Sequence, residues 1–161
     1  MATDFGGLTS VLADNGVEVI VIGGLAAQAH GSARLTQDAD FVYRRSPENM
    51  ERLATALASY RPYLRGAPPG LPFAFDAETI RRGLNFTLTT TLGDVDFLGE
   101  IVGGGKYEDL EPHTSALSVF GREVLVIDLP ALIRAKRAAG RPKDLEAIAE
   151  LEALLAERER I

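Results

Sequence analysis

The sequence predicts an α+β protein: a small mixed, partly antiparallel sheet flanked by helices, with a helical pair at the C-terminus. Three observations predict this class. Residues 17–22 form a nearly continuous β-branched run, which is typical of a buried strand. In residues 84–98, threonine recurs at alternate positions and a glycine interrupts the run, as in a hairpin. Residues 142–158 repeat leucine and isoleucine at helical spacing.

The first half of the chain alternates short helices and strands. Ser46 followed by Pro47 is a helix start, with Ser46 as the N-cap. A segment over 61–72 has four prolines and two glycines, which predicts a loop. The remaining elements expected here are helices over 4–15 and 25–30, both stopped by glycine, and strands over 17–22 and 38–43.

The second half is expected to hold two hairpins and then two helices. The elements are strands over 84–92 and 95–98 with a turn at Gly93-Asp94, strands over 116–120 and 123–126, and helices over 130–139 and 142–158. The chain reads as one domain over 1–161, with a sheet-containing core over 1–128 and C-terminal helices over 129–161.

Composition narrows the function classes. The chain has 161 residues, no cysteine and a net charge of −6. The missing thiols exclude disulfides, thiolate zinc sites and thiol nucleophiles. The negative charge disfavours broad, non-specific binding to nucleic acid. The sequence contains no apolar run of bilayer length, and its start, MATDFGG, lacks a secretory signal. We therefore expect a cytoplasmic protein with no membrane partner.

The stretch over 17–43 is the most informative. A strand leads into Gly23-Gly24, whose backbone N–H groups are open to an anion. Asp38 and Asp40 follow at positions i and i+2 of the next strand, so both carboxylates project to one face. Two such groups side by side resist joint ionisation unless a cation lies between them.

A second acid pair strengthens this interpretation. Asp94 and Asp96 repeat the i, i+2 arrangement on a later strand. If the two strands are neighbours, three carboxylates converge, which suits two Mg²⁺ ions acting on an in-line phosphoryl displacement. The simpler interpretation is that Asp38 ends a loop and Asp94 is an ordinary turn residue, both solvated.

These residues resemble the nucleotidyltransferase superfamily of DNA polymerase β type. The matching signature is Ile22-Gly23-Gly24, a spacer over 25–37, and Asp38-Ala39-Asp40 before Phe41. The extended pattern Gly-Gly-x-Ala…His-Gly…Arg-x-Thr-x-Asp-x-Asp is similar to a small bacterial group that includes the AbiEii-type toxins. That pattern is formed by Gly23, Gly24, Ala26, His30, Gly31, Arg34, Thr36, Asp38 and Asp40. The segment from Leu132 to Leu151, with Gly140-Arg141-Pro142-Lys143-Asp144 in it, also resembles the closing helices of that group.

The resemblance implies a role for particular residues. Asp38 and Asp40 would hold two Mg²⁺ ions as catalytic ligands, and Asp96 fits the third acid of the family better than Asp94 does. Gly23 and Gly24 would bind the triphosphate of an NTP, although Gly24 replaces the serine of many members. The chain is also shorter than many toxins of the group.

Four further residues are candidates for contacts with the NTP. Arg34 suits a phosphate clamp, with a solvated loop arginine as an equal alternative. Thr36, like Arg34, lies in the segment just before the acid pair. Lys136 and Lys143 match the family pattern in the last helices, whereas Arg137 reads as a solvated surface residue. These candidates are Arg34, Thr36, Lys136 and Lys143.

Several other motifs favour structural roles. Asp144 lies in the first turn of the last helix, where a carboxylate complements the helix dipole. His30 is expected to pack near the glycine turn, and the aromatic residues around the proline-rich loop are expected to pack rather than stack a base. The run Gly103-Gly104-Gly105-Lys106 lacks the serine or threonine of a P-loop.

The sequence therefore predicts a Mg²⁺-dependent nucleotidyltransferase that moves an NMP from an NTP to an acceptor hydroxyl and releases pyrophosphate. The acceptor, an RNA such as tRNA, a protein or a small molecule, is left open. The resemblance adds an expectation of a toxin–antitoxin component with a cognate antitoxin. The alternative is a non-catalytic nucleotide-binding subunit or sensor of the same fold. A dinucleotide-binding turn is disfavoured, because Leu25-Ala26-Ala27 breaks the glycine spacing.

Overall fold

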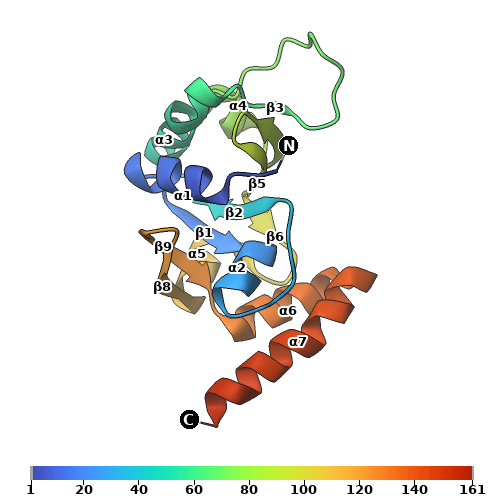
Figure 1. Cartoon of the computed structure of the whole chain (residues 1–161). Helices are drawn as coiled ribbons and strands as arrows, with labels where there is room; N and C mark the ends of the chain where they lie inside the picture. The colour runs from blue at the N-terminus through green and yellow to red at the C-terminus, as the bar shows by residue number, and fades with distance from the viewer. Residues whose placement is uncertain (1, 161) are drawn as a thin grey trace.

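A mixed sheet of seven strands lies at the centre of the structure, a computed structural model that describes residues 2–160 (Figure 1). The strand order is β3-β4-β5-β2-β1-β9-β8. The strands are β1 (Val19–Ile22), β2 (Ala39–Tyr43), β3 (Tyr63–Leu64), β4 (Asn85–Thr90), β5 (Gly93–Leu98), β8 (Thr114–Val119) and β9 (Arg122–Ile127). A separate two-stranded ribbon joins β6 (Glu100–Ile101) to β7 (Gly105–Lys106).

The central strands bring segments that are distant in the sequence together. β1 pairs antiparallel with β2, and on its other side it pairs parallel with β9. β2 pairs parallel with β5, so the two predicted acidic strands are direct neighbours. All four residues of β1 are buried, as the β-branched run predicts.

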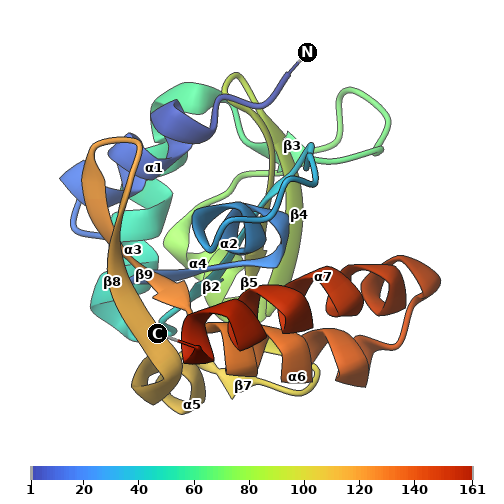
Figure 2. The same ribbon diagram turned by 60° about the horizontal axis from the view of Figure 1, so that its bottom comes forward.

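The helices flank this sheet and were largely predicted. They are α1 (Phe5–Asp14), α2 (Gly23–Ala29), α3 (Pro47–Leu57), α4 (Ala77–Arg82), α5 (Tyr107–Leu110), α6 (Leu129–Ala139) and α7 (Pro142–Glu159). Ser46 caps α3 as expected, because its side chain accepts a hydrogen bond from the backbone N–H of Asn49. Figures 1 and 2 show α1 and α3 at one end of the molecule and the paired α6 and α7 at the other.

The core lies between the sheet and these helices. Phe41 and Phe97 stack with their ring centroids 5.8 Å apart, on the strand face opposite to the acidic residues. Phe75 packs edge-on against Phe86 and stacks on Phe97. The expectation that the aromatic residues near the proline-rich loop pack internally is therefore confirmed for Phe75, which is buried.

The structure corrects some local assignments. The turn between β4 and β5 is at residues 91–92, because Thr90 already pairs with Gly93. Asp94 is therefore a strand residue and not a turn residue. The short elements α4, α5, β3, β6 and β7 were not predicted. Leu145 on α7 is 56% exposed, although it belongs to the leucine and isoleucine repeat over 142–158. Among residues 2–160, no helix is both long and apolar enough to cross a bilayer.

Candidate active site

The four acidic residues of the two Asp-x-Asp segments lie on one face of the sheet. Asp40 on β2 is the register partner of Asp96 on β5. Asp38 lies two residues before Asp40, directly ahead of β2, and Asp94 lies two residues before Asp96. Register partners on adjacent strands share a face, so the pairing of β2 with β5 collects the carboxylates that the sequence separates widely.

Asp40 is the most perturbed acid of the cluster. The pKa of Asp40 is raised to about 7, chiefly by burial and then by the charge of Asp96, a hydrogen bond with Asp96, and the charge of Asp38. The charge of Lys143 lowers the pKa of Asp40. Like charges held this close resist joint ionisation, so the pair Asp40 and Asp96 favours a shared proton or a bound cation.

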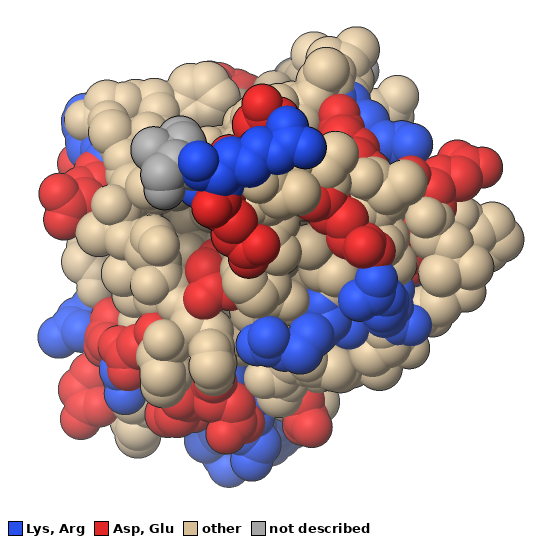
Figure 3. All heavy atoms as spheres, turned by 90° about the horizontal axis from the view of Figure 1, so that it is seen from below, with Lys and Arg blue, Asp and Glu red and all other residues tan. Residues whose placement is uncertain are grey.

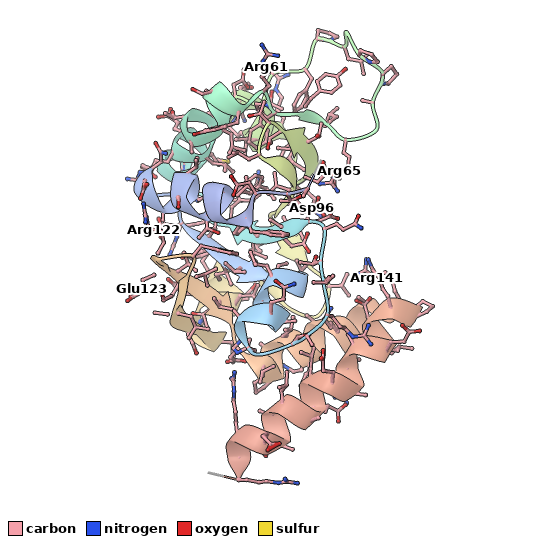
Figure 4. The ribbon with its side chains drawn as sticks, in the orientation of Figure 1. Arg61, Arg65, Asp96, Arg122, Glu123 and Arg141 are labelled. Carbon is pink, nitrogen blue, oxygen red and sulfur yellow. The ribbon has the colours of Figure 1, made fainter. Side chains whose placement is uncertain are left out.

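A guanidinium group contacts the other side of the cluster. Arg65 follows β3, and its Nη2 donates to Asp96 Oδ1 at 2.9 Å. The same group lies 3.6 Å from Asp38 Oδ2 and 3.5 Å from Asp94 Oδ2. Its Nη2 also donates to the backbone carbonyl of Leu88 at 2.8 Å. Figure 4 shows Arg65 and Asp96 side by side at this edge of the site. One cation is thus shared by three carboxylates.

The donor chemistry of the cluster suits a hard divalent cation. Asp38, Asp40 and Asp96 offer only carboxylate oxygens, which Mg²⁺ prefers over nitrogen and sulfur ligands. Within residues 2–160, no three His, Cys, Asp or Glu side chains converge closely enough to enclose one ion in the conformation described here. Arg65 supplies the positive charge in that conformation.

The glycine pair lies against this cluster. Gly23 directly follows β1 and begins α2 with φ at +64°, and a Cβ atom there would collide with the carboxylate of Asp40. A Cβ atom on Gly24 would lie 2.6 Å from Cβ of Thr36. Thr36 in turn donates its hydroxyl to the backbone carbonyl of Asp38 at 3.1 Å. The residues at 23 and 24 therefore must be small for the acidic loop to close over the start of α2.

Basic side chains from α6, α7 and the loop before β2 surround the glycine pair. Arg34 donates from Nη2 to the backbone carbonyl of Glu146 at 3.2 Å, so it is turned towards α7 rather than being a free loop residue. Lys143 is exposed beside Asp40. Lys136 is largely buried, and its Nζ lies 3.7 Å from Asp144 Oδ1.

Asp144 holds Arg141 and Lys136 in place, which agrees with its predicted structural role. Its carboxylate is 2% exposed and accepts from Arg141 Nε at 2.6 Å and Nη2 at 3.1 Å. It also accepts from the backbone N–H of Arg141 at 3.3 Å. Burial acts to raise the pKa of Asp144, but the hydrogen bond and charge of Arg141 and the charge of Lys136 outweigh it, so the pKa is lowered.

Two cavities of about 310 Å³ each meet at the cluster. The first is lined largely by apolar residues, and the second holds four basic side chains, of Arg34, Lys136, Arg141 and Lys143, together with four acidic ones. Both are bounded by Gly23, Asp40, Lys136, Arg141 and Asp144. The first cavity adds Asn85, Asp96, Leu98, Glu100, Ile101 and Leu132, among others. The second adds Gly24, Ser32, Arg34, Thr36, Asp38 and Lys143, among others. We call them the apolar cavity and the basic cavity.

Other polar candidates have structural roles. His30 is buried, and its Nε2 lies 2.6 Å from the backbone carbonyl of Ile127, so it packs as expected. Arg137 forms an exposed ion pair with Glu152 on α7, as a surface residue would. On the face that includes the C-terminal helices, acidic and basic side chains are interspersed (Figure 3). This face lacks the continuous basic field that broad nucleic-acid binding requires.

Sequence reasoning missed three residues of the site. Arg65 falls in the predicted proline-rich loop and has no local motif. Asn85 and Glu100 line the apolar cavity, and neither belongs to a motif that marks it in the sequence. In contrast, the two cavities take in all nine predicted site residues: Gly23, Gly24, Arg34, Thr36, Asp38, Asp40, Asp96, Lys136 and Lys143.

Comparison with known proteins supports the fold. No protein-family model matches the chain, and no curated protein sequence is similar to it. A solved structure from Thermotoga maritima, of a protein provisionally described as a nucleotidyltransferase, aligns with a TM-score of 0.55 at 14% identity. The alignment covers 92% of this chain and 94% of that one. The chain therefore has a nucleotidyltransferase-like α+β fold, and the match does not extend to the AbiEii group.

Proposed function

We propose that the protein is a Mg²⁺-dependent nucleotidyltransferase. The observation that most supports this is the register pairing of Asp40 with Asp96, directly beside Gly23. That pairing gathers carboxylates next to a backbone segment without side chains, and the pKa of Asp40 is raised there. The negative charge of the carboxylate cluster favours a bound cation, and no side chain covers the backbone at Gly23. The two features together suit a metal–triphosphate complex. The fold match supports the same class.

In this proposal each of the two cavities holds one of the two substrates. The triphosphate lies in the basic cavity, against Gly23 and Gly24, with Arg34 and Lys143 close to its oxygens. Arg34 would then exchange its hydrogen bond with the Glu146 carbonyl for one with phosphate. The acceptor approaches from the apolar cavity, which reaches Asp96 from the other side. Asp40 borders both cavities and so lies where the two substrates meet.

In the reaction, the acceptor hydroxyl oxygen attacks the α-phosphorus, and the bond from that phosphorus to the bridging oxygen breaks. Pyrophosphate leaves with the bonding electrons. Asp96 accepts the proton of the hydroxyl. Asp38, Asp40 and Asp96 would hold the magnesium, which neutralises charge developing on the phosphate oxygens when bound.

The acceptor class stays open between RNA, protein and small molecules, as does a toxin role with a cognate antitoxin. Toxicity has a simple test: expression of the wild-type chain should slow growth, and the variant Asp40→Asn should relieve the effect. Equal growth with both chains would contradict a toxin role and leave the transfer reaction to be judged separately.

The transfer reaction is tested by pyrophosphate release from each NTP with Mg²⁺ and candidate acceptors. Binding of a non-hydrolysable NTP with Mg²⁺ or with EDTA is measured alongside. We expect Asp38→Ala and Asp40→Ala to abolish both release and the metal-dependent part of binding. Glu123→Gln is the control, because Glu123 is exposed on the β8–β9 hairpin away from Asp96 (Figure 4).

The proposal fails if both alanine variants retain transfer and metal-dependent binding. Tight NTP binding to the wild-type chain with no turnover on any acceptor would instead favour the alternative of a non-catalytic nucleotide sensor.

A further inference from the structure

Arg65 reaches the acidic cluster because of its place in the sheet. β3 is an edge strand, and it pairs antiparallel with β4. The backbone N–H of Arg65 continues this pairing by donating to Thr87 at 3.0 Å. Thr87 is the register partner of Asp96 on β5. Arg65, Thr87 and Asp96 therefore follow one another across the same face, and the long arginine side chain crosses the short threonine to reach the acids.

The guanidinium is held firmly but not fully satisfied. It has the charged hydrogen bond to Asp96 and the bond to the carbonyl of Leu88, and its side chain is 25% exposed. Its Nε is buried without a hydrogen-bond acceptor, and the nearest acid oxygen, on Asp94, is 3.5 Å away. A buried donor without an acceptor has a free-energy cost. The guanidinium therefore contacts several acids without satisfying all of its own donors.

The same oxygens are those that a divalent ion needs. Mg²⁺ and Mn²⁺ bind oxygen at close range, and Asp96 Oδ1 already accepts from Arg65. Asp38 Oδ2 is also within 3.6 Å of the guanidinium. An ion placed between Asp38 and Asp96 would lie against a positive charge in a partly buried site, where repulsion between cations is weakly screened.

We propose that Arg65 is an internal counter-ion of the carboxylate cluster, and that a divalent cation binds there by displacing its guanidinium. This rests on the proposed function, since it takes the cluster to be a metal site. The Arg65 guanidinium thereby competes with the divalent cation for the carboxylates and lowers the metal affinity of the protein. Because β3 is at the sheet edge, the side chain has an exit towards solvent beside the projecting loop that follows it (Figures 1 and 4).

The test is a titration with Mn²⁺ alone, with free Mn²⁺ measured by electron paramagnetic resonance. Arg65→Gln should bind Mn²⁺ roughly tenfold more tightly than wild type, about the effect of one charged hydrogen bond. Arg65→Lys keeps the charge without the planar fork, and a smaller gain is expected. Arg61→Gln is the matched control, since it removes one positive charge from the same segment at a site further from Asp96 (Figure 4). Its affinity should stay within twofold of wild type.

Unchanged or weaker Mn²⁺ binding by Arg65→Gln would overturn the inference, while Mn²⁺ binding that still depends on Asp40 would leave the proposed function standing. If neither the wild-type chain nor any of the variants binds Mn²⁺, both the inference and the proposed function are overturned. A second measurement needs no variant: in the wild-type chain, saturating Mg²⁺ should shift the Nε–Hε nuclear magnetic resonance signal of Arg65. A signal that stays fixed at saturation would also overturn the inference.

Discussion

At the scale of single residues, the site depends on positions where only a small or an acidic side chain fits. Gly23 has φ at +64° and faces the carboxylate of Asp40. Asp40 in turn is partly buried beside Asp96. The glycine therefore controls two properties at once, the left-handed backbone that starts α2 and the space in which Asp40 is held.

Substitution Gly23→Ala should separate these two properties when it is compared with Gly16→Ala. Gly16 has nearly the same φ, +66°, but nothing lies within 4 Å of an added Cβ. Both variants should lose roughly 1–2 kcal/mol of unfolding free energy from the left-handed backbone. Only Gly23→Ala should also lose roughly a hundredfold in transfer rate, because it displaces Asp40. Urea unfolding and pyrophosphate release measure the two effects. Equal rates in both variants would refute the steric argument.

The pKa of Asp40 gives a second prediction, for the metal-free protein. The native value is about 7 and the ordinary value is 3.8, so between them the native state binds a proton that the unfolded chain has released. Stability from this group is therefore fully present below about pH 4 and is lost as the pH rises through 7.

The measurement is the difference in unfolding free energy between wild type and Asp40→Asn in EDTA, followed with pH. The wild-type chain should become less stable relative to the variant from about pH 4 to 8. A difference that stays constant would show that the pKa of Asp40 is unshifted, and one that grows in favour of wild type would show that it is lowered; either would contradict the prediction.

At the scale of elements, α6 and α7 are joined to the site by one buried carboxylate. Asp144 accepts from Arg141 at the start of α7 and lies 3.7 Å from Lys136 on α6. Lys136 and Arg141 both border the two cavities, so this contact fixes the basic wall of the site.

Asp144→Asn should lower the unfolding free energy by about 2 kcal/mol, since it removes a buried charge that accepts from Arg141 and neutralises the largely buried Lys136. Glu152→Gln is the matched control. It breaks the exposed pair with Arg137 between the same two helices, and it should change stability by less than about 1 kcal/mol. Similar losses in the two variants would contradict the special role of Asp144.

Comparison of sequence and structure at this scale shows what local pattern can predict. The β-branched run of β1 and the Ser46 cap of α3 are both encoded within a few residues, and both were predicted. The helix α4 has only six residues, too few to show a period, and it was missed. Arg65 was missed because its contacts depend on the β3–β4–β5 pairing, which no short window contains.

At the scale of the whole molecule, the parallel pairing of β2 with β5 is the feature that assembles the site. The two Asp-x-Asp patterns were visible in the sequence. Whether their strands are neighbours could be learned only from the strand order of the sheet. The C-terminal helices then close the site from the side opposite α1 and α3 (Figure 2).

Binding of metal and nucleotide should stabilise the entire chain. With Mg²⁺ and a non-hydrolysable NTP at about a hundred times Kd, the Tm should rise by about 5–10 °C, following mass action on the native state. Asp40→Asn should lose the part of the rise that depends on Mg²⁺. An equal rise in EDTA would show that nucleotide binding does not use a metal.

The most direct test of a metal–triphosphate site is a crystal soaked with Mn²⁺ and a non-hydrolysable NTP, with anomalous scattering used to locate manganese. We predict manganese on Asp38, Asp40 and Asp96, the triphosphate against Gly23 and Gly24, and the Arg65 guanidinium moved off Asp96. Nucleotide bound elsewhere, with Arg65 still on Asp96 and no manganese on the acids, would contradict the assignment.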